Sequence, residues 1–333
     1  MFIERNRVAT ERPASEGGIQ SPDISTIVVS YNTAHLLREF FAAVEAARQD
    51  LKLQIIVVDN ASTDQSVELL RSREADIELI ENQANVGFGR ANNQALARTA
   101  GRYLLLLNTD AFVQPDTLTK TFHFMEAHAD VGVLGVKLVG RDGKLQPSCR
   151  YFPTPWNVFA ARYGLTSLFA STRLVDDLSW DHASVRDCDW VPGCYYLVRR
   201  EVIDRVGLFD PRYFVYYEEV DHCRRVRAAG WRVVFYPFST VVHIGGESAK
   251  SAGRSLNSGR QIPVLQIESE LLYFRKQYGV AGLVANVVLN MFGDALSLSK
   301  RIVKRHDRGG NPMITWAMLK ILVKTWFASR PSH

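Results

Sequence analysis

The chain has 333 residues, of which 47% are hydrophobic and 23% are charged. This length and balance exclude a mainly disordered chain, and they allow either two domains or one large α/β domain with an appendage. The formal net charge is +5, but residues 271–333 contain ten Lys and Arg against two acids, which makes that segment +8 and the remainder −3. The asymmetry marks the C-terminal segment as a separate unit that suits an anionic partner.

The first 22 residues are polar and show no apolar period, so we expect a flexible segment there. Their charged residues are not followed by an apolar stretch, and no secretory signal is therefore expected. The four cysteines form no CxxC pair: Cys149, Cys188, Cys194 and Cys223. We expect structural thiols in a reducing cytoplasm, with a loose zinc site at Cys188 and Cys194 as the weaker alternative.

Residues 24–110 alternate between apolar runs and amphipathic runs. The apolar, β-branched runs predict four strands, at 24–30, 53–58, 77–80 and 103–107. The patterns between them predict three helices, after Thr33, near Asp64 and over 89–100. This alternation predicts a doubly wound, Rossmann-like α/β fold with a mainly parallel sheet flanked by helices.

Polar residues follow each of the four predicted strands. They are Tyr31-Asn32, Asp59-Asn60, the stretch 82–92 and Asn108-Thr109-Asp110. In doubly wound sheets, ligands bind beyond the carboxyl ends of the strands, where these residues would meet. The order of the elements therefore predicts a ligand site at this edge of the sheet.

The second half of the chain is less regular. Its patterns predict helices at 117–128, 201–206 and 219–229, and strands at 131–139, 189–199, 231–236 and 241–243. Residues 144–186 are irregular and rich in aromatic residues and proline, and we expect a long loop region that lies over a site and contacts substrate.

The sequence pattern of the C-terminal region predicts two helices, at about 264–307 and 312–328. The apolar stretch 280–298 contains Asn286, Asn290 and Asp294, which argue against a membrane-spanning helix. The last stretch combines tryptophans with aliphatic and basic residues. Two interpretations stay open for it: peripheral contact with a membrane surface, or docking on the catalytic domain or on a second copy in a homo-oligomer.

Three constellations suggest chemistry. Asp110, in a strand-ending turn, can hold a divalent cation through its carboxylate, although Asn and Asp also favour ordinary turns. The acids Glu218, Glu219 and Asp221 can supply a general base, although acids also suit a helix N-terminus. His243, at the end of an apolar run, can ligate a metal, although a lone histidine is commonly structural.

In their order along the chain, these motifs resemble family 2 glycosyltransferases of the GT-A fold, closest to the rhamnosyltransferase-like branch. The matching segments are TIVVSYN (26–32), IIVVDNASTDQS (55–66), NVGFGRANN (85–93), LLLLNTDAFV (104–113), the long segment 191–237 and VVHIGGES (241–248). The resemblance covers residues 24–250 and leaves the C-terminal region uncovered. It implies a GT-A catalytic domain over 23–262, with a nucleotide-binding half (23–113) and an acceptor half (114–262), followed by a basic helical region (263–333).

The resemblance implies specific roles in donor binding. It places Tyr31 and Asn32 in the nucleoside pocket, Asp59 at the donor's base, Asn85, Gly87 and Asn92 in a loop near the nucleotide, and Asn108 and Asp110 in the metal motif. Asn108 replaces the first acid of that motif, so Asp110 becomes the main protein ligand of Mg²⁺ or Mn²⁺, with His243 as a further ligand.

The resemblance also implies the catalytic residues. Glu218 and Glu219 fall on the family's Glu-Asp motif, whose second residue is the usual base. Here that residue is Glu219, with Asp221 as the reserve candidate. A single displacement with one base inverts the anomeric carbon.

The expected function is transfer of a sugar, rhamnose favoured, from a nucleotide-diphosphate donor to a glycan or lipid-linked saccharide during surface polysaccharide synthesis. The favoured donor is dTDP-rhamnose, with a UDP-sugar as the alternative. We expect a cytoplasmic enzyme with no nucleic-acid partner, and contact with the inner membrane face is one of the two interpretations left open for the C-terminal region. A dinucleotide-dependent oxidoreductase is disfavoured because no GxGxxG follows the first strand. A non-catalytic nucleotide- or carbohydrate-binding module of the same fold stays as the alternative.

Overall fold

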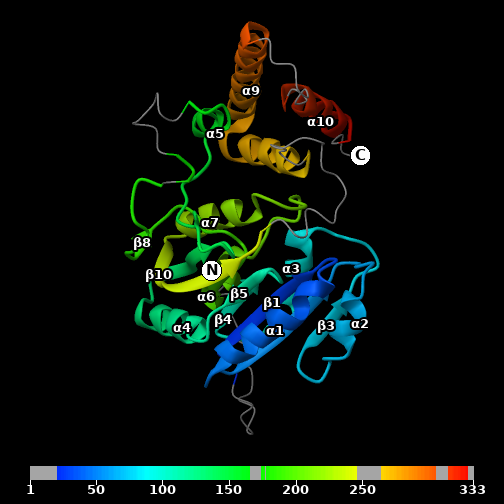
Figure 1. Cartoon of the computed structure of the whole chain (residues 1–333), viewed down its shortest axis with the longest axis vertical. Helices are drawn as coiled ribbons and strands as arrows, with labels where there is room; N and C mark the ends of the chain where they lie inside the picture. Colours follow the sequence, from blue (N-terminus) through cyan, green and yellow to red (C-terminus); the bar gives the residue numbers. More distant parts are fainter. Residues whose placement is uncertain (1–20, 166–173, 177, 246–263, 305–313, 329–333) are drawn as a thin grey trace, which may run out of the picture.

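The computed structural model describes residues 21–165, 174–176, 178–245, 264–304 and 314–328. The predicted flexible segment 1–22 and the predicted domain boundary at 262–263 lie almost entirely outside this part of the chain. The described residues form a mixed ten-stranded sheet with helices on both faces and a pair of helices beyond it (Figure 1). The predicted α/β class, with a mixed sheet flanked by helices and a C-terminal helical extension, is confirmed.

One half of the sheet consists of the parallel strands β3, β2, β1 and β4, in that order. Their bounds are Ile24–Ser30 for β1, Leu53–Asp59 for β2, Glu78–Glu81 for β3 and Tyr103–Leu107 for β4. The register pairs Ser30 with Asp59 and Asp59 with Glu81, so these strands end together. The polar residues that follow them therefore lie at one edge, as the sequence predicted.

Helices cover both faces of the sheet, which is why its central strands are apolar throughout. The first face carries α1 (Ala34–Arg48), α2 (Ser66–Arg71) and α4 (Thr117–Ala127). The second face carries α3 (Phe88–Leu96), α6 (Arg200–Val206) and α7 (Glu218–Ala228). The N-terminus of α7 therefore starts on the second face, close to the edge where the parallel strands end.

The other half of the sheet contains antiparallel pairs. It is built from β5 (Ala111–Val113), β6 (Val131–Val139), β7 (Leu145–Gln146), β8 (Arg186–Asp187), β9 (Tyr195–Arg199) and β10 (Arg232–His243). Strand β9 lies between β4 and β6 and is antiparallel to both. The end of β10 pairs with β5, where His243 is opposite Ala111. This pairing brings the end of β10 back to the carboxyl end of β4.

Three local predictions differ from the structure. The strand predicted at 189–199 is regular only over β9, and the strands predicted at 231–236 and 241–243 form one strand with a register shift between Tyr236 and Thr240. The stretch 144–186, predicted as irregular, contains α5 (Pro155–Arg162). Its start has a capping box between Thr154 and Asn157 with proline at the first turn, a short signal inside an aromatic-rich segment.

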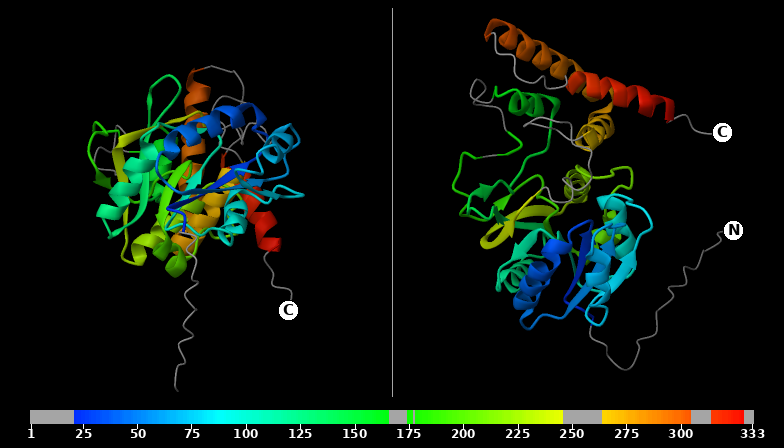
Figure 2. Two further views of the ribbon diagram at one scale, coloured as in Figure 1. Left: turned by 90° about the horizontal axis from the view of Figure 1, so that it is seen from below. Right: turned by 45° about the vertical axis from the view of Figure 1, so that its right-hand side comes forward.

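The C-terminal region contains α9 (Val264–Lys304) and α10 (Ile314–Ala328), which pack together at one end of the molecule (Figures 1 and 2). Gly279 has φ 67° and ψ −162°, so α9 bends sharply there into two helical segments. Within the described residues, one helix, Val264–Ser299, is long and apolar enough to cross a membrane by length and composition. The predicted pair of helices is present.

Candidate active site

Asp110 and His243 lie side by side although 133 residues separate them in the sequence. The turn after β4 is closed by a hydrogen bond from the Ala111 amide to the Asn108 carbonyl, and the end of β10 pairs with β5 directly behind it. The Nε2 atom of His243 is 3.6 Å from Oδ1 of Asp110, and the Gly245 amide donates to Oδ2 of Asp110 at 3.2 Å. Asp110 is therefore fixed in place with one oxygen facing the imidazole.

Gln146 determines which nitrogen of His243 carries the proton. Its amide nitrogen donates to the His243 carbonyl at 2.8 Å, so its amide oxygen accepts from Nδ1–H, also at 2.8 Å. Burial lowers the pKa of His243, and the charge of Arg150 lowers it further against the opposing effect of Asp110. The neutral ring then directs the lone pair of Nε2 toward Asp110.

This arrangement fits a divalent cation. An imidazole lone pair and a carboxylate oxygen face each other with no proton between them. Two ligands that share one ion at about 2.1 Å each would be about 3.0–3.4 Å apart, slightly closer than the 3.6 Å found here. Metal-bound histidines commonly donate their other N–H to an oxygen, as His243 does to Gln146. Among the described residues no group of three or more His, Cys, Asp or Glu could hold a metal, so phosphate oxygens and water would complete the coordination.

The two adjacent acids at the start of α7, Glu218 and Glu219, influence each other's charge. Glu218 is 3% exposed and Glu219 is partly exposed. Burial, and then the charge of Glu219, raise the pKa of Glu218 well above its usual value. Burial also raises the pKa of Glu219, while backbone N–H groups and Arg150 oppose the shift. Glu218 therefore holds a proton more firmly, and Glu219 is the member that ionises first.

The backbone before these acids is strained. Tyr216 and Tyr217 have φ angles of 69° and 67°, a left-handed conformation that costs non-glycine residues about 1–3 kcal/mol each. These two residues lead directly into α7, whose first residue, Glu218, is buried. In the described part of the chain, the Oε2 atoms of Glu218 and Glu219 have no hydrogen-bond partner. Buried polar atoms without partners are costly, and they indicate a group that a ligand completes.

The short loop Gly193–Cys194 brings the two halves of the site together. The Cys194 carbonyl accepts from the Asn108 amide at 3.1 Å, and the Gly193 amide donates to the Glu219 carboxylate. Burial raises the pKa of Cys194, and the charges of Asp110 and Glu219 both raise it further. Both carboxylates are therefore within electrostatic reach of the same buried thiol, with His243 beside Asp110.

Arg150 is a residue of this site that sequence reasoning did not identify. Its charge lowers the pKa of Glu219 and of His243. Its guanidinium is held by Asp176 at 2.9 Å and lies 4.8 Å above the ring of Trp190. Arg150 and Gln146 come from the irregular stretch that was expected to lie over the site, but nothing in that stretch distinguishes them from solvent-facing residues.

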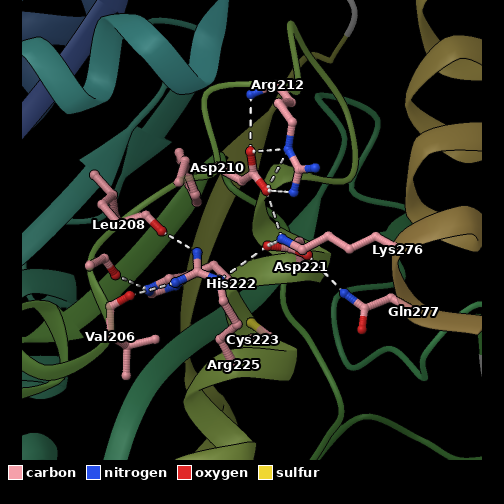
Figure 3. A network of polar contacts seen from close by, with 12 residues as sticks. Val206, Leu208, Asp210, Arg212, Asp221, His222, Cys223, Arg225, Lys276 and Gln277 are labelled. Atoms are coloured by element: carbon pink, nitrogen blue, oxygen red, sulfur yellow. Dashed lines mark hydrogen bonds and ion pairs between the residues drawn. The ribbon is translucent and has the colours of Figure 1, made fainter. Parts of the chain in front are cut away.

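Asp221, the reserve candidate for the base, lies in a different environment (Figure 3). Its side chain is fully buried and accepts from Lys276 at 2.7 Å and from Gln277 at 2.8 Å, both on α9, and from Arg225 at 3.1 Å. Lys276 also pairs with Asp210 at 2.7 Å. Both oxygens of Asp221 are therefore occupied by donors, which favours Glu219 over Asp221 as the base.

The predicted nucleoside residues lie at the ends of β1 and β2. Asp59 is 1% exposed and accepts from the hydroxyl and the amide of Ser62, at 2.6 and 2.9 Å. Asn32 has a φ angle of 53°. Its side-chain oxygen accepts from the Thr63 amide at 2.7 Å, and its backbone amide donates to the Ser62 hydroxyl at 2.9 Å. Tyr31 is partly exposed next to them. The loop after β2 thus ties Asp59 to Asn32, the residue that follows Tyr31.

The predicted nucleotide loop is tied to the α7 side of the site. Asn85 accepts from Asn60 at 2.8 Å and from the Gly87 amide at 2.9 Å. Gly87 has φ 90°, and a Cβ atom there would be 2.4 Å from the Phe214 carbonyl, so only glycine fits. Asn92 donates to the Phe88 carbonyl at 2.9 Å, whereas its buried Oδ1 has no partner within the described residues.

Comparisons with known proteins agree with this architecture. Residues 25–169 match the sequence profile of glycosyl transferase family 2. The chain is 28% identical over 250 residues to the N-acetylglucosaminyl-diphospho-decaprenol L-rhamnosyltransferase of Mycobacterium tuberculosis, an alignment that covers 69% of this chain and 78% of that protein. It is 21% identical over 211 residues to the low-salt glycan biosynthesis hexosyltransferase of Haloferax volcanii, covering 62% of each.

Among solved structures, the fold is similar to that of a mannosyltransferase from Pyrobaculum calidifontis determined with GDP-Man and Mn²⁺. The TM-score is 0.54 at 20% sequence identity, and the match covers 94% of this chain and 82% of that protein. At this identity the likeness concerns the fold, which is the GT-A arrangement expected from the sequence.

Proposed function

We propose that this chain, which is a family 2 glycosyltransferase, moves a sugar from a nucleotide-diphosphate donor to a saccharide hydroxyl in one inverting displacement. In this proposal Asp110 and His243 would hold a divalent cation at the donor diphosphate, and Glu219 would act as the general base. The observation that carries it is that the Gly193–Cys194 loop links the two sides of the site. Cys194 accepts from Asn108 in the turn that holds Asp110 beside His243, and the Gly193 amide donates to Glu219.

The donor half would hold the nucleotide. Asp59 and Asn32 lie at the carboxyl ends of adjacent parallel strands, where doubly wound sheets bind ligands. Asp110 and His243 would bind the cation, which would neutralise the charge that the diphosphate develops as it leaves. Arg150 adds a fixed positive charge close to this pair and to Glu219, and its stacking on Trp190 keeps it in place.

Glu219 would take the proton of the acceptor hydroxyl as that oxygen attacks the anomeric carbon. Its raised pKa makes it a stronger base than a free carboxylate, while the Gly193 amide and Arg150 keep the charged form accessible. Glu218 would stay protonated next to it. One base and no covalent intermediate imply inversion at the anomeric carbon.

We propose a rhamnosyl donor, with dTDP-rhamnose before a UDP-sugar, and a lipid-linked saccharide as acceptor. The support is the similarity to the mycobacterial protein, whose name gives an L-rhamnosyl donor group and a diphospho-decaprenol acceptor. A cytoplasmic enzyme acting at the inner membrane face, in surface glycan synthesis, would meet both substrates.

A donor panel tests the proposal. Purified protein is incubated with dTDP-rhamnose, UDP-sugars and GDP-mannose, each with Mn²⁺ or with EDTA, and release of the nucleoside diphosphate is measured against a diphosphoprenol-linked acceptor. We expect release that requires both the acceptor and the metal. Donor binding without any transfer would instead support the non-catalytic binding module.

A further inference from the structure

The second segment of α9 has an inverted distribution of polarity. From Val280 to Leu298, every exposed side chain is apolar. The exposed large side chains are Val280, Val284, Val288, Met291, Phe292 and Leu298, each more than half exposed and together called the outer face here. A water-facing helix surface normally carries charged residues, so an apolar face of this length indicates a surface that is covered in the cell.

The polar residues of the same segment point inward, where protein groups satisfy them. Asn290 accepts from Arg162 at 2.7 Å, and Asn286 donates to Glu270 at 3.0 Å. Asp294 accepts from Tyr163 at 2.9 Å and from the Thr315 hydroxyl at 2.7 Å. These bonds attach one side of the segment to α5, to α10 and to the first segment of α9.

This attachment decides between crossing a membrane and lying on one. A helix that spans a membrane alone would need an apolar surface all round, whereas this segment has a polar side that is hydrogen-bonded to the rest of the protein. Only the outer face is available to lipid. The geometry therefore suits burial of one face in the boundary between head groups and acyl chains, with the helix axis in the membrane plane.

The charged residues near the outer face indicate what kind of surface covers it. Directly after the outer face, the sequence contains Lys300, Arg301, Lys304, Arg305 and Arg308 with one acid, Asp307. On α10, Trp316 is 59% exposed, and the Lys320 ammonium lies 5.2 Å from its ring. Basic residues next to an apolar face favour anionic lipid, and tryptophan favours the interface. Pairing of two copies through this face is the competing occupant, and the test below distinguishes it from lipid.

We propose that the outer face of α9, together with Trp316, binds the surface of a bilayer that contains anionic lipid. The inference goes beyond the transfer reaction, since it rests on α9 and α10 and not on the candidate active site. Lys276 and Gln277, which hold Asp221, belong to the first segment of the same helix, so a bound membrane would have a fixed orientation relative to α7.

Vesicle flotation with the full chain tests the proposal without any assay of activity. Vesicles of phosphatidylcholine alone are compared with vesicles of phosphatidylcholine and phosphatidylglycerol, at low and at high salt. We expect binding to the anionic vesicles that weakens with salt. The double variant Val288→Gln, Phe292→Gln should bind about tenfold more weakly, because two apolar side chains no longer leave water on binding.

Phe238→Gln is the matched control, because Phe238 is 59% exposed on β10 and lies outside the outer face. It should bind vesicles like the wild type, and all variants should keep the wild-type melting temperature. Three results would overturn the proposal: no binding to either vesicle, equal binding by the double variant, or a wild-type dimer in gel filtration that the double variant converts to monomer without any effect on lipid. Equal binding to neutral vesicles would overturn the role of anionic lipid. A Glu219→Gln variant that binds vesicles normally would separate this inference from the proposed reaction.

Discussion

The candidate active site and the C-terminal helices both bury acids and amides, but they differ in how those groups are satisfied. At the start of α7, Glu218 and Glu219 each leave one buried oxygen without a hydrogen-bond partner among the described residues. Around α9, Glu270 and Asp294 are bonded to residues of other helices. Unsatisfied buried groups indicate a site that a ligand completes, whereas satisfied ones indicate structure.

The same contrast separates two carboxylates on one helix. Glu219 and Asp221 are two residues apart on α7, yet Asp221 is bonded to Lys276, Gln277 and Arg225. The sequence presents both as candidates for the base. Their hydrogen-bond partners distinguish them. Substitutions test this difference: they should alter activity at the candidate active site and stability at the C-terminal helices.

Replacing the base should have the largest effect. Glu219→Gln should lower turnover by about 10²–10⁴-fold, because the acceptor hydroxyl loses its proton acceptor, while donor affinity stays near the wild-type value. Steady-state rates and calorimetric titration of the donor measure the two quantities. Glu201→Gln, on the exposed side of α6, is the control and should leave both unchanged. Normal turnover in Glu219→Gln would contradict the assignment of Glu219, and not Asp221, as the base.

In the C-terminal region the effect should be on stability. Arg162→Met leaves Glu270, whose side chain is 1% exposed, without its 2.6 Å ion pair, and should cost about 3–5 kcal/mol of unfolding free energy. Urea denaturation measures the loss. Arg141→Met breaks an ion pair of the same length with Glu39 at the surface and should cost about 1 kcal/mol or less. Equal losses would show that the Arg162 pair is not a structural anchor.

Gln146 offers a test of the metal pair without touching a ligand. Gln146→Leu removes the acceptor that fixes Nδ1–H of His243, and the Mn²⁺ concentration for half-maximal activity should rise about 10–100-fold. A titration with Mn²⁺ measures this shift. Gln54→Leu, at the opposite end of the parallel strands, is the matched control. An unchanged Mn²⁺ requirement in Gln146→Leu would argue that His243 does not bind the ion.

The smallest expected effect is a change in pH dependence. Because the folded-state pKa of Glu218 is raised, the stability linked to its protonation is present at low pH and is lost as pH rises through that pKa. Glu218→Gln removes this group, so the variant should lose less stability than the wild type between acidic and neutral pH. Melting temperatures across that range measure the difference. Parallel curves for the two proteins would contradict a raised pKa at Glu218.

Much of the fold could be predicted from the sequence because its signals are local. The apolar runs of β1, β2 and β4 and the stripe of α1 are short-range patterns, and each element formed close to its expected bounds. Helix α5 was missed because its signal is a single capping box in an irregular segment. The pairing of β10 with β5 was also not predictable, since it depends on contacts between distant segments.

For the candidate site, the motifs pointed to Asp110, His243 and Glu219. The fold places Asp110 beside His243, and the Gly193–Cys194 loop links their turn to Glu219. The supporting residues Gln146 and Arg150 could not be identified, because a lone Gln or Arg in an irregular stretch carries no spacing signal. Two partners of Asp221, Lys276 and Gln277, come from α9, which the family resemblance does not cover. The roles of the named residues remain predictions.

The central claim is that Asp110 and His243 share one divalent cation with the donor diphosphate. The most direct measurement is the anomalous diffraction of Mn²⁺ in crystals grown with a nucleoside diphosphate. The account predicts one manganese peak bonded to Oδ1 of Asp110, to Nε2 of His243 and to two phosphate oxygens. A diphosphate bound with its manganese away from both side chains would contradict it.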